Sequence, residues 1–317
     1  MFLQGIWCSI LFVKLQLSLN TEIEYWGMMK NTTSDMLGNR SDIPEGVLVV
    51  VGGNEDKEND LDILRKIIEV TNNNNPIAEI ITTASGIPKE TGTAYLNAFD
   101  KIGISNANLI HIGTRDQANN NEYLERIRKA DIIFFTGGDQ LKITSILGGT
   151  PILQEVRRKY FNEKCVIVGT SAGASSMPDT MIYGGESGEA LCKGVVQMTG
   201  GVGLVKRMII DSHFIKRGRF SRLMEAVSLN PGYIGLGLGE DTGVIIRKGH
   251  ILEAIGNGLV VIFDGHGIKY SNISSLKDGE AIAVEGVLVH TLTNGHGYNI
   301  WTREYLNPTC QKGNEDD

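Results

Sequence analysis

Two kinds of apolar pattern alternate along the chain from residue 47 onward. Short runs rich in Ile, Val and Phe predict buried strands at 47–53, 78–85, 108–113, 131–139 and 165–173. Between them, apolar residues spaced three and four apart predict amphipathic helices at 61–72, 93–103, 121–130, 140–149 and 152–161. Runs buried on both faces that alternate with helices indicate an α/β fold, a mostly parallel sheet with helices on both faces.

The pattern changes after residue 230. Two stretches, GLGLGEDTGVIIRKGHILEAIGNGLVVIFDGHG and GEAIAVEGVLVHTL, read as strands separated by short glycine turns. They predict C-terminal β-hairpins added to the edge or end of the sheet. We therefore expect one α/β domain over residues 45–303, followed by a polar tail over 304–317.

Residues 1–44 are expected to lie outside this domain as a disordered or processed segment. Their apolar run, Ile6 to Val13, follows no Lys or Arg and is far shorter than the ~20 residues of a membrane helix. A loosely attached tail is therefore favoured over a signal peptide or an anchor, and a translation start at Met28 or Met29 would remove the run. We expect a cytoplasmic protein without a membrane partner, with secretion left open by the run.

Composition narrows the function classes. The 317 residues include 30 basic and 37 acidic ones, a net charge of −7, so the chain lacks the overall basic footprint of a nucleic-acid-binding protein. Four widely spaced cysteines without a CxxC pair argue against a disulfide scaffold or a zinc site, and no metal or cofactor is expected. Glycine is abundant, with 39 residues, and six of them lie at the ends of predicted strands, where ligands bind in such sheets: Gly52, Gly53, Gly137, Gly138, Gly169 and Gly173.

Gly169-Thr-Ser171-Ala-Gly173 directly follows a predicted strand and matches the G-x-S-x-G nucleophile elbow. A sharp strand-to-helix turn needs small neighbours and lifts the hydroxyl of Ser171 above the sheet. The amide of Ala172, at the start of a helix, could then stabilise an oxyanion. The alternative is a serine that caps the helix, with glycines for tight packing.

A nucleophilic serine needs a base and a carboxylate that orients it. Of six histidines, His213 alone follows an apolar strand and precedes several arginines, so it is the candidate general base. Glu240 and Asp241 end another apolar strand, and since neighbouring side chains point to opposite faces, only one of them should reach the imidazole. The alternative is a hairpin turn with solvated acids.

Two further segments could contact a substrate. In Gly137-Gly138-Asp139-Gln140, a glycine amide could complete the oxyanion hole, with Gln140 near the substrate; the alternative role of Asp139 is a helix N-cap. Residues 217 and 219 do not share a helical face, so a loop of arginines near the candidate base would suit a substrate rich in carboxylates. The alternative is a solvated basic helix face.

Five motifs together resemble those of cyanophycinases, serine hydrolases of peptidase family S51 that are related to aspartyl dipeptidases. They are GGNEDK (52–57), FFTGGDQ (134–140), GTSAGA (169–174), DSHFIKRGRFSRL (211–223) and GLGLGEDTG (235–243), and the similarity spans about residues 45–300. The resemblance implies a class I glutamine-amidotransferase-like fold and a dimer. It also implies hydrolysis of cyanophycin, a poly-aspartate backbone with arginine on each β-carboxyl, to β-Asp-Arg dipeptides.

Carried over position by position, the resemblance implies a triad of Ser171, His213 and Glu240 acting through an acyl-enzyme. The implied oxyanion and substrate residues are Gly137, Gly138, Ala172, Gln140, Asp211, Arg217, Arg219 and Arg222. The chain departs from the family at Ser212, where a glutamine is usual, and at Gly239, where an aspartate is frequent. A related S51 peptidase acting on other aspartyl or isoaspartyl peptides is therefore the alternative.

Two other functional classes are alternatives to a cyanophycinase. An amidotransferase-like or aspartyl-dipeptidase hydrolase would share the fold and differ in its substrate. A nucleotide- or sugar-binding module would use the glycine loops for phosphate, but the chain has no G-x-G-x-x-G with a following ribose-binding acid and no Walker lysine.

Overall fold

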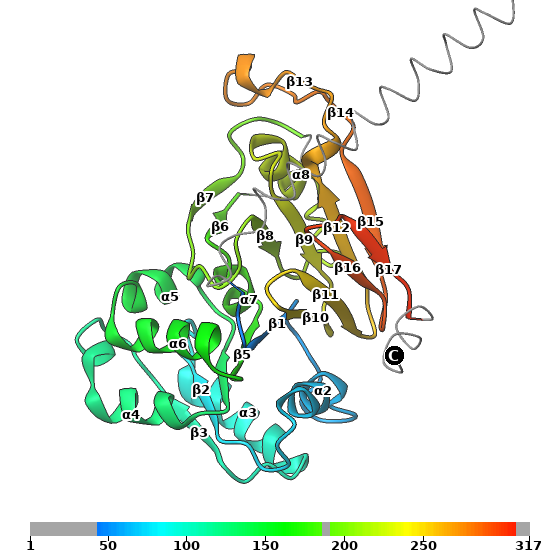
Figure 1. The fold of residues 1–317 in the computed structure, drawn as a ribbon. Helices are drawn as coiled ribbons and strands as arrows, with labels where there is room; N and C mark the ends of the chain where they lie inside the picture. The colour runs from blue at the N-terminus through cyan, green and yellow to red at the C-terminus, as the bar shows by residue number, and fades with distance from the viewer. Residues whose placement is uncertain (1–42, 186–190, 309–317) are drawn as a thin grey trace, which may run out of the picture. The chain divides into compact units, whose positions relative to one another are not determined.

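The computed structural model describes residues 43–185 and 191–308, and within them two sheets dominate (Figure 1). The main sheet has nine strands in the order β17-β16-β11-β10-β1-β5-β4-β2-β3. Its parallel half consists of β1 (Val47–Val51), β2 (Ala78–Ile81), β3 (Ala107–Ile110), β4 (Ile132–Phe135) and β5 (Val166–Thr170). The mostly parallel sheet with helices on both faces is confirmed.

Helices connect the strands of this half, and two of them, α5 and α6, lie in succession between β4 and β5. They are α2 (Asp62–Thr71), α3 (Pro88–Lys101), α4 (Asn121–Lys129), α5 (Gln140–Leu147), α6 (Pro151–Asn162) and α7 (Ala172–Ser176), with a short turn η2 (Gln117–Asn119). Helix α3 begins five residues before the predicted start, because Pro88 occupies its first turn, where the missing amide is no loss. The predicted strand 165–173 divides into β5 and α7.

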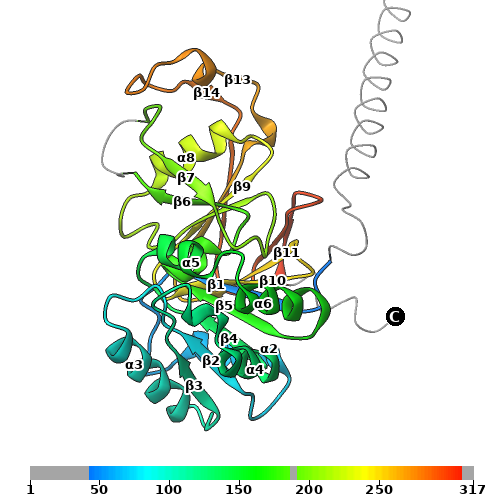
Figure 2. The same ribbon diagram turned by 90° about the vertical axis from the view of Figure 1, so that its left-hand side faces the viewer.

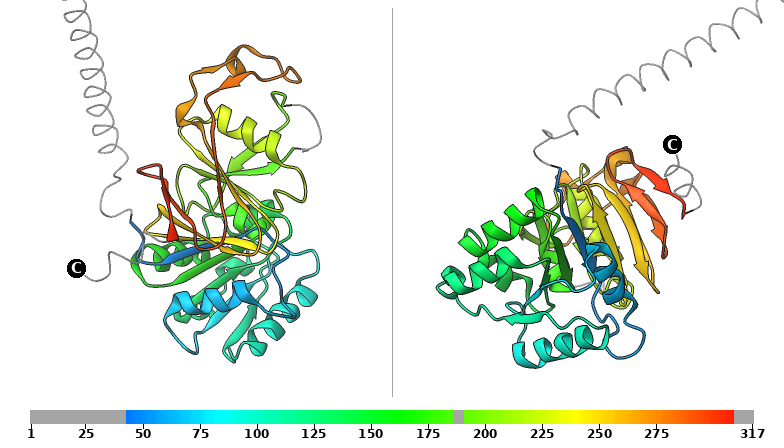
Figure 3. Two further views of the ribbon diagram at one scale, coloured as in Figure 1. Left: turned by 90° about the vertical axis from the view of Figure 1, so that its right-hand side faces the viewer. Right: turned by 60° about the horizontal axis from the view of Figure 1, so that its bottom comes forward.

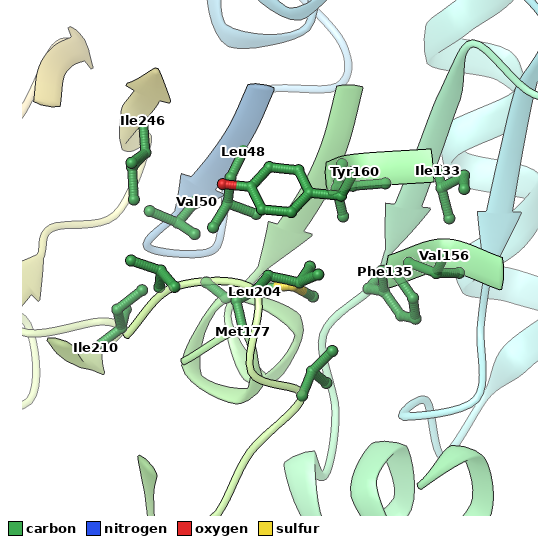
Figure 4. Close-up of a cluster of buried hydrophobic side chains, with 14 of the residues drawn as sticks. Leu48, Val50, Ile133, Phe135, Val156, Tyr160, Met177, Leu204, Ile210 and Ile246 are labelled. Atoms are coloured by element: carbon green, nitrogen blue, oxygen red, sulfur yellow. The ribbon is translucent and has the colours of Figure 1, made fainter. Parts of the chain in front are cut away.

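Side-chain alternation along β1 separates two apolar cores. Leu48 and Val50 face a cluster that includes Tyr160 of α6, and Figure 4 shows these side chains together. Val49 and Val51 face the opposite cluster, which α2 and α3 cover. Both faces of the strand are therefore buried against apolar side chains, and this packing holds its C-terminal end in place.

The C-terminal strands divide between two sheets. Strands β10 (Thr242–Arg247), β11 (Ile251–Gly256), β16 (Gly297–Asn299) and β17 (Glu304–Leu306) extend the main sheet in antiparallel fashion from β1, as the yellow and red strands beside the blue one show in Figure 3. This edge extension agrees with the predicted hairpins. Residues 304–306, expected to begin a polar tail, form its last strand.

A second sheet was not predicted. It has the order β15-β12-β9-β8 and contains β8 (Met208–Asp211), β9 (Ile234–Leu238), β12 (Val260–Asp264) and β15 (Leu288–Leu292). Helix α8 (Phe220–Leu229) connects the parallel pair β8 and β9 (Figure 1), and Figure 2 shows α8 beside β7 and β9. Smaller elements are β6 (Thr180–Gly184), β7 (Gln197–Gly200), β13 (Tyr270–Ser271), β14 (Val284–Glu285), η3 (Gly265–Gly267) and η4 (Ile273–Ser275).

The expectations for residues 1–42 and 309–317 lie outside the described residues. In the part of the chain that the structure describes, none of the helices combines the length and the apolar character needed to span a bilayer.

Candidate active site

Ser171 lies in the turn between β5 and α7, with φ 52° and ψ −113°. This positive φ is a strained conformation for a residue with a side chain. Its neighbours explain the glycines of the motif: a Cβ at Gly169 would lie 2.6 Å from the carbonyl oxygen of Gly173, and one at Gly173 would lie 2.3 Å from that of Phe135. The Ser171 hydroxyl makes no capping hydrogen bond, so the alternative of a helix-capping serine is wrong.

Three loops from different parts of the chain bring their side chains together at Ser171. Its Oγ lies 2.8 Å from Nε2 of His213, and the other ring nitrogen, Nδ1, lies 2.8 Å from Oε1 of Glu240. The second carboxylate oxygen, Oε2, accepts a hydrogen bond of 3.3 Å from Nδ2 of Asn54. The hydroxyl, the imidazole and the carboxylate therefore form one continuous hydrogen-bonded chain.

Of the two adjacent acids, only Glu240 reaches the imidazole. The carboxylate of Asp241 accepts instead from the amide of Asp56 and from the side chain of Asn257. The hydrogen bond from His213 is the largest influence on Glu240 and holds the pKa of this carboxyl below its usual range. Glu240 is therefore ionised at neutral pH and can fix the orientation of the ring.

The C-terminal end of β1 holds all three loops through its backbone. The carbonyls of Val51, Gly52 and Gly53 accept, in that order, the amides of residue 171 at 2.9 Å, residue 213 at 2.8 Å and residue 241 at 3.0 Å. A Cβ at Gly53 would lie 2.5 Å from Nε2 of His213, and one at Gly52 would lie 1.9 Å from the carbonyl oxygen of Gly239. Only glycine fits beneath the imidazole.

The candidate oxyanion residues differ in their distance from Ser171. A Cβ at Gly137 would lie 3.6 Å from the serine Oγ, whereas Gly138 packs against the backbone of Ala84. Ala172 begins α7, so its amide lies at the helix N-terminus next to the serine. These positions favour Gly137 over Gly138 as a partner of Ala172. The side chain of Asp139 caps α5, as its alternative role predicted.

The predicted substrate residues fall into two groups by burial. Asp211 is 1% exposed and accepts 3.0 Å and 2.7 Å hydrogen bonds from Nη1 of Arg219 and Nε of Arg222. Arg222 also donates to the carbonyl of Gly185. Asp211 and Arg222 are thus enclosed and paired with each other.

The remaining predicted residues are more open. Arg217 is exposed, and among the described residues its side chain makes no hydrogen bond or ion pair. Nε of Arg219 is buried and has no hydrogen-bond partner within residues 43–185 and 191–308, and burial lowers the pKa of this guanidinium. Nε2 of Gln140 donates 3.0 Å to the carbonyl of Ile182. Arg217 is therefore the arginine best placed to meet a ligand.

The sequence profile of Peptidase family S51 matches residues 47–254. The chain belongs to peptidase family S51. A cyanophycinase of Geminocystis herdmanii is 34% identical over 257 residues, which cover 81% of this chain and 94% of the relative. A cyanophycinase of Synechococcus elongatus is 31% identical over 260 residues, which cover 82% of this chain and 81% of the relative.

A solved structure supports the fold of this S51 peptidase. The crystal structure of a peptidase from an acI-B1 Actinobacterium matches with a TM-score of 0.62 at 21% identity, and the match covers 81% of this chain and 98% of that one. The family membership makes the chain a peptidase, a hydrolase of the serine type.

Sequence reasoning missed the contribution of the segment that follows Gly53. Asn54 holds Glu240, and the next residue, Glu55, is 3% exposed. The Glu55 carboxylate accepts hydrogen bonds from Thr170 Oγ1 at 2.7 Å and from the hydroxyl of Tyr95, and Lys57 Nζ lies 3.5 Å away. The motif GGNEDK contained these residues, but a charged run after a strand reads as a solvated loop until its burial is known.

Proposed function

We propose that this S51 peptidase hydrolyses cyanophycin and releases β-Asp-Arg dipeptides through a triad of Ser171, His213 and Glu240. The observation that carries the proposal is the unbroken hydrogen-bonded chain between these three side chains. The relatives named cyanophycinase, which match about four fifths of the chain, support the substrate.

The mechanism follows the positions of the side chains. His213 Nε2 takes the proton of the serine hydroxyl as Oγ of Ser171 attacks the backbone carbonyl of an aspartyl residue. The amides of Ala172 and Gly137 stabilise the resulting oxyanion. The protonated imidazole then gives its proton to the leaving amine, and an acyl-enzyme remains on the serine oxygen. Water, deprotonated by the same imidazole, releases the acid and restores the hydroxyl.

Charge at the site is consistent with this substrate. Arg217 is exposed and unpaired among the described residues, so it can bind a carboxylate of the polymer. Cyanophycin offers such a carboxylate on every arginyl unit. Arg222 and Asp211 are enclosed, so their ion pair would hold in place the turn between β8 and α8 that carries Arg217.

A second substrate class is favoured by one observation. Ser212 is 4% exposed and its hydroxyl accepts a 3.4 Å hydrogen bond from Ser175, so this position offers no long amide to a ligand. The family usually has a glutamine at this position, and the contact that its side chain would make with the substrate is not available to Ser212. Other aspartyl or isoaspartyl peptides are therefore the alternative substrates.

The test is incubation of the protein with purified cyanophycin and, separately, with α- and β-aspartyl peptides, with product analysis by liquid chromatography and mass spectrometry. We expect β-Asp-Arg from the polymer, and loss of the product when Ser171→Ala is used. Cleavage of short aspartyl peptides with none of the polymer would support the alternative. Product formation at the parental rate by Ser171→Ala would overturn the mechanism.

A further inference from the structure

A cavity of about 390 Å³ opens beside Ser171 on the side of α3. Ile87, Glu90, Ala94 and their neighbours, spaced three to four residues apart, form one wall, because such residues share one face of a helix. Ser171 and residues 137 and 170 belong to the opposite lining. The cavity is therefore continuous with the atom that we propose as the nucleophile.

The cavity lies away from the arginines discussed above. Arg217 and Arg219 belong to the turn between β8 and α8, whereas the cavity faces α3, and Figure 1 shows α8 above α7 and α3 below it. A chain that passes over Ser171 would thus contact the arginines on one side of its scissile bond and this cavity on the other.

The lining of the cavity combines apolar surface with three charged side chains, of which Glu55 and Lys57 form an ion pair with each other. The side chain of Ile87 is 62% exposed, and the ring of Tyr95 forms a buried part of the wall. Lys57 Nζ donates 2.9 Å to the carbonyl of Glu55, lies near its carboxylate and sits 4.9 Å from the centre of the Tyr95 ring. Glu90 is exposed and, among the described residues, its carboxylate has no hydrogen bond or ion pair.

This combination matches one arginyl unit of the proposed substrate. Such a unit has a guanidinium, an aliphatic stem and a free α-carboxylate, and a guanidinium binds a carboxylate through two parallel hydrogen bonds. An ammonium has three donors; one of those of Lys57 binds the carbonyl of Glu55, and the Glu55 carboxylate lies 3.5 Å away, so at least one donor is left for an anion. The apolar side chains of the same lining, Ile87 and Ala94, suit the stem.

We propose that this cavity is a subsite for an arginyl unit of the substrate, with the guanidinium on Glu90, the stem against Ile87 and Ala94, and the α-carboxylate on Lys57. The inference rests on the proposed function and adds to it the residue that selects the cationic side chain. Glu90 is the specificity-determining residue, because it is the charged residue of the lining that has no ion pair with another described residue.

The test compares two soluble substrates, a short β-Asp-Arg oligomer and the same oligomer with citrulline in place of arginine. Citrulline keeps the shape of the side chain and removes its charge. Glu90→Gln should lower kcat/KM for the arginine oligomer about tenfold, the lower range for a hydrogen bond to a charged group, mainly through KM. It should change kcat/KM for the citrulline oligomer less than twofold.

Asp100→Asn is the matched control, since it removes one exposed carboxylate from the same helix outside the cavity. It should leave kcat/KM for both oligomers unchanged. An equal loss on both oligomers in Glu90→Gln, or no loss on either, would overturn the subsite while the parent activity on the arginine oligomer still stands. Absence of activity in the parent protein would instead overturn the proposed function together with the subsite.

Discussion

The backbone amide of His213 donates a 2.8 Å hydrogen bond to the carbonyl of Gly52 at the end of β1. Ser171 and Asp241 are held in the same way by the two flanking carbonyls, and all three of these residues have φ between 47° and 52°. Positive φ costs free energy for residues with a side chain, so the three hydrogen bonds hold strained loops in place. One strand end thereby sets the spacing of the proposed catalytic groups.

Gly53→Ala should separate the imidazole from the serine without unfolding the protein. The new methyl group would lie 2.5 Å from Nε2 of His213, and a displacement of about 1 Å at a catalytic group costs on the order of a hundredfold in rate. We expect kcat/KM to fall by about that factor, measured on a soluble β-aspartyl-arginine substrate.

Gly103→Ala is the control for the backbone effect of this substitution. Gly103 also has a positive φ, of 85°, but a Cβ there would meet no atom within 4 Å. It should lower the free energy of unfolding by about 1 kcal/mol and leave kcat/KM unchanged. Equal kinetic losses in the two variants would show that strain, rather than displacement of the ring, is responsible.

Thr170→Val should weaken the support beneath the nucleophile. The Thr170 hydroxyl donates to the buried carboxylate of Glu55, and removing a partner of a buried charged group costs about 1.5–3 kcal/mol. We expect a loss of that size in the free energy of unfolding, measured by urea denaturation, together with a lower kcat. Thr144→Val, which removes an exposed hydroxyl of α5, should cost less than about 0.5 kcal/mol. Similar losses in both variants would contradict a supporting role for this contact.

The titration of Glu240 should depend on His213. Because the hydrogen bond from the imidazole is the largest cause of the lowered pKa of Glu240, His213→Ala should move this pKa up towards its ordinary value of about 4.3. Carbon-13 NMR of labelled glutamate carboxyls measures the change. His111→Ala, in a histidine next to β3 at the far edge of the main sheet, should leave the titration of Glu240 in place. An unaltered titration in His213→Ala would mean that the ring and the carboxylate are not paired in solution.

Replacing Arg222 should lower stability, whereas replacing Arg217 should weaken substrate binding. Arg222→Met removes a partner of the enclosed Asp211 carboxylate, which should cost about 3 kcal/mol in the free energy of unfolding. Arg217→Met should leave stability within about 0.5 kcal/mol and raise KM, because its side chain is exposed. Thermal unfolding measures the stability of both variants, and steady-state kinetics measures their KM. A stable Arg222→Met protein with a raised KM would show instead that Arg222 binds the substrate directly.

Local patterns in the sequence were sufficient for the parallel half of the fold. Each predicted strand from 47 to 173 overlaps an observed strand, because uninterrupted apolar runs bounded by glycine have few other uses. The second sheet was missed, since the pairing of β8 with β9 and of β12 with β15 joins residues far apart in the chain. Nothing local distinguishes a hairpin on the main sheet from a strand of another one.

In the site, too, local motifs identified some residues, whereas the roles of others depend on contacts between distant segments of the chain. The glycines of 169–173 and the alternation at 240–241 identified Ser171 and one acid, because each is a local requirement. Burial of Glu55 and the pairing of Asp211 with Arg222 depend on which elements meet in space. Those roles depend on α3, which supplies Tyr95 to Glu55, and on α8, which supplies Arg222 to Asp211.

Covalent labelling tests the proposed nucleophile most directly. The protein is treated with a fluorophosphonate at neutral pH, and the modified residue is located by peptide mass spectrometry. We expect one adduct per chain, on Ser171, with labelling at least a hundredfold slower in His213→Ala. An adduct on another serine such as Ser175, or full turnover of substrate by a protein labelled on Ser171, would contradict it.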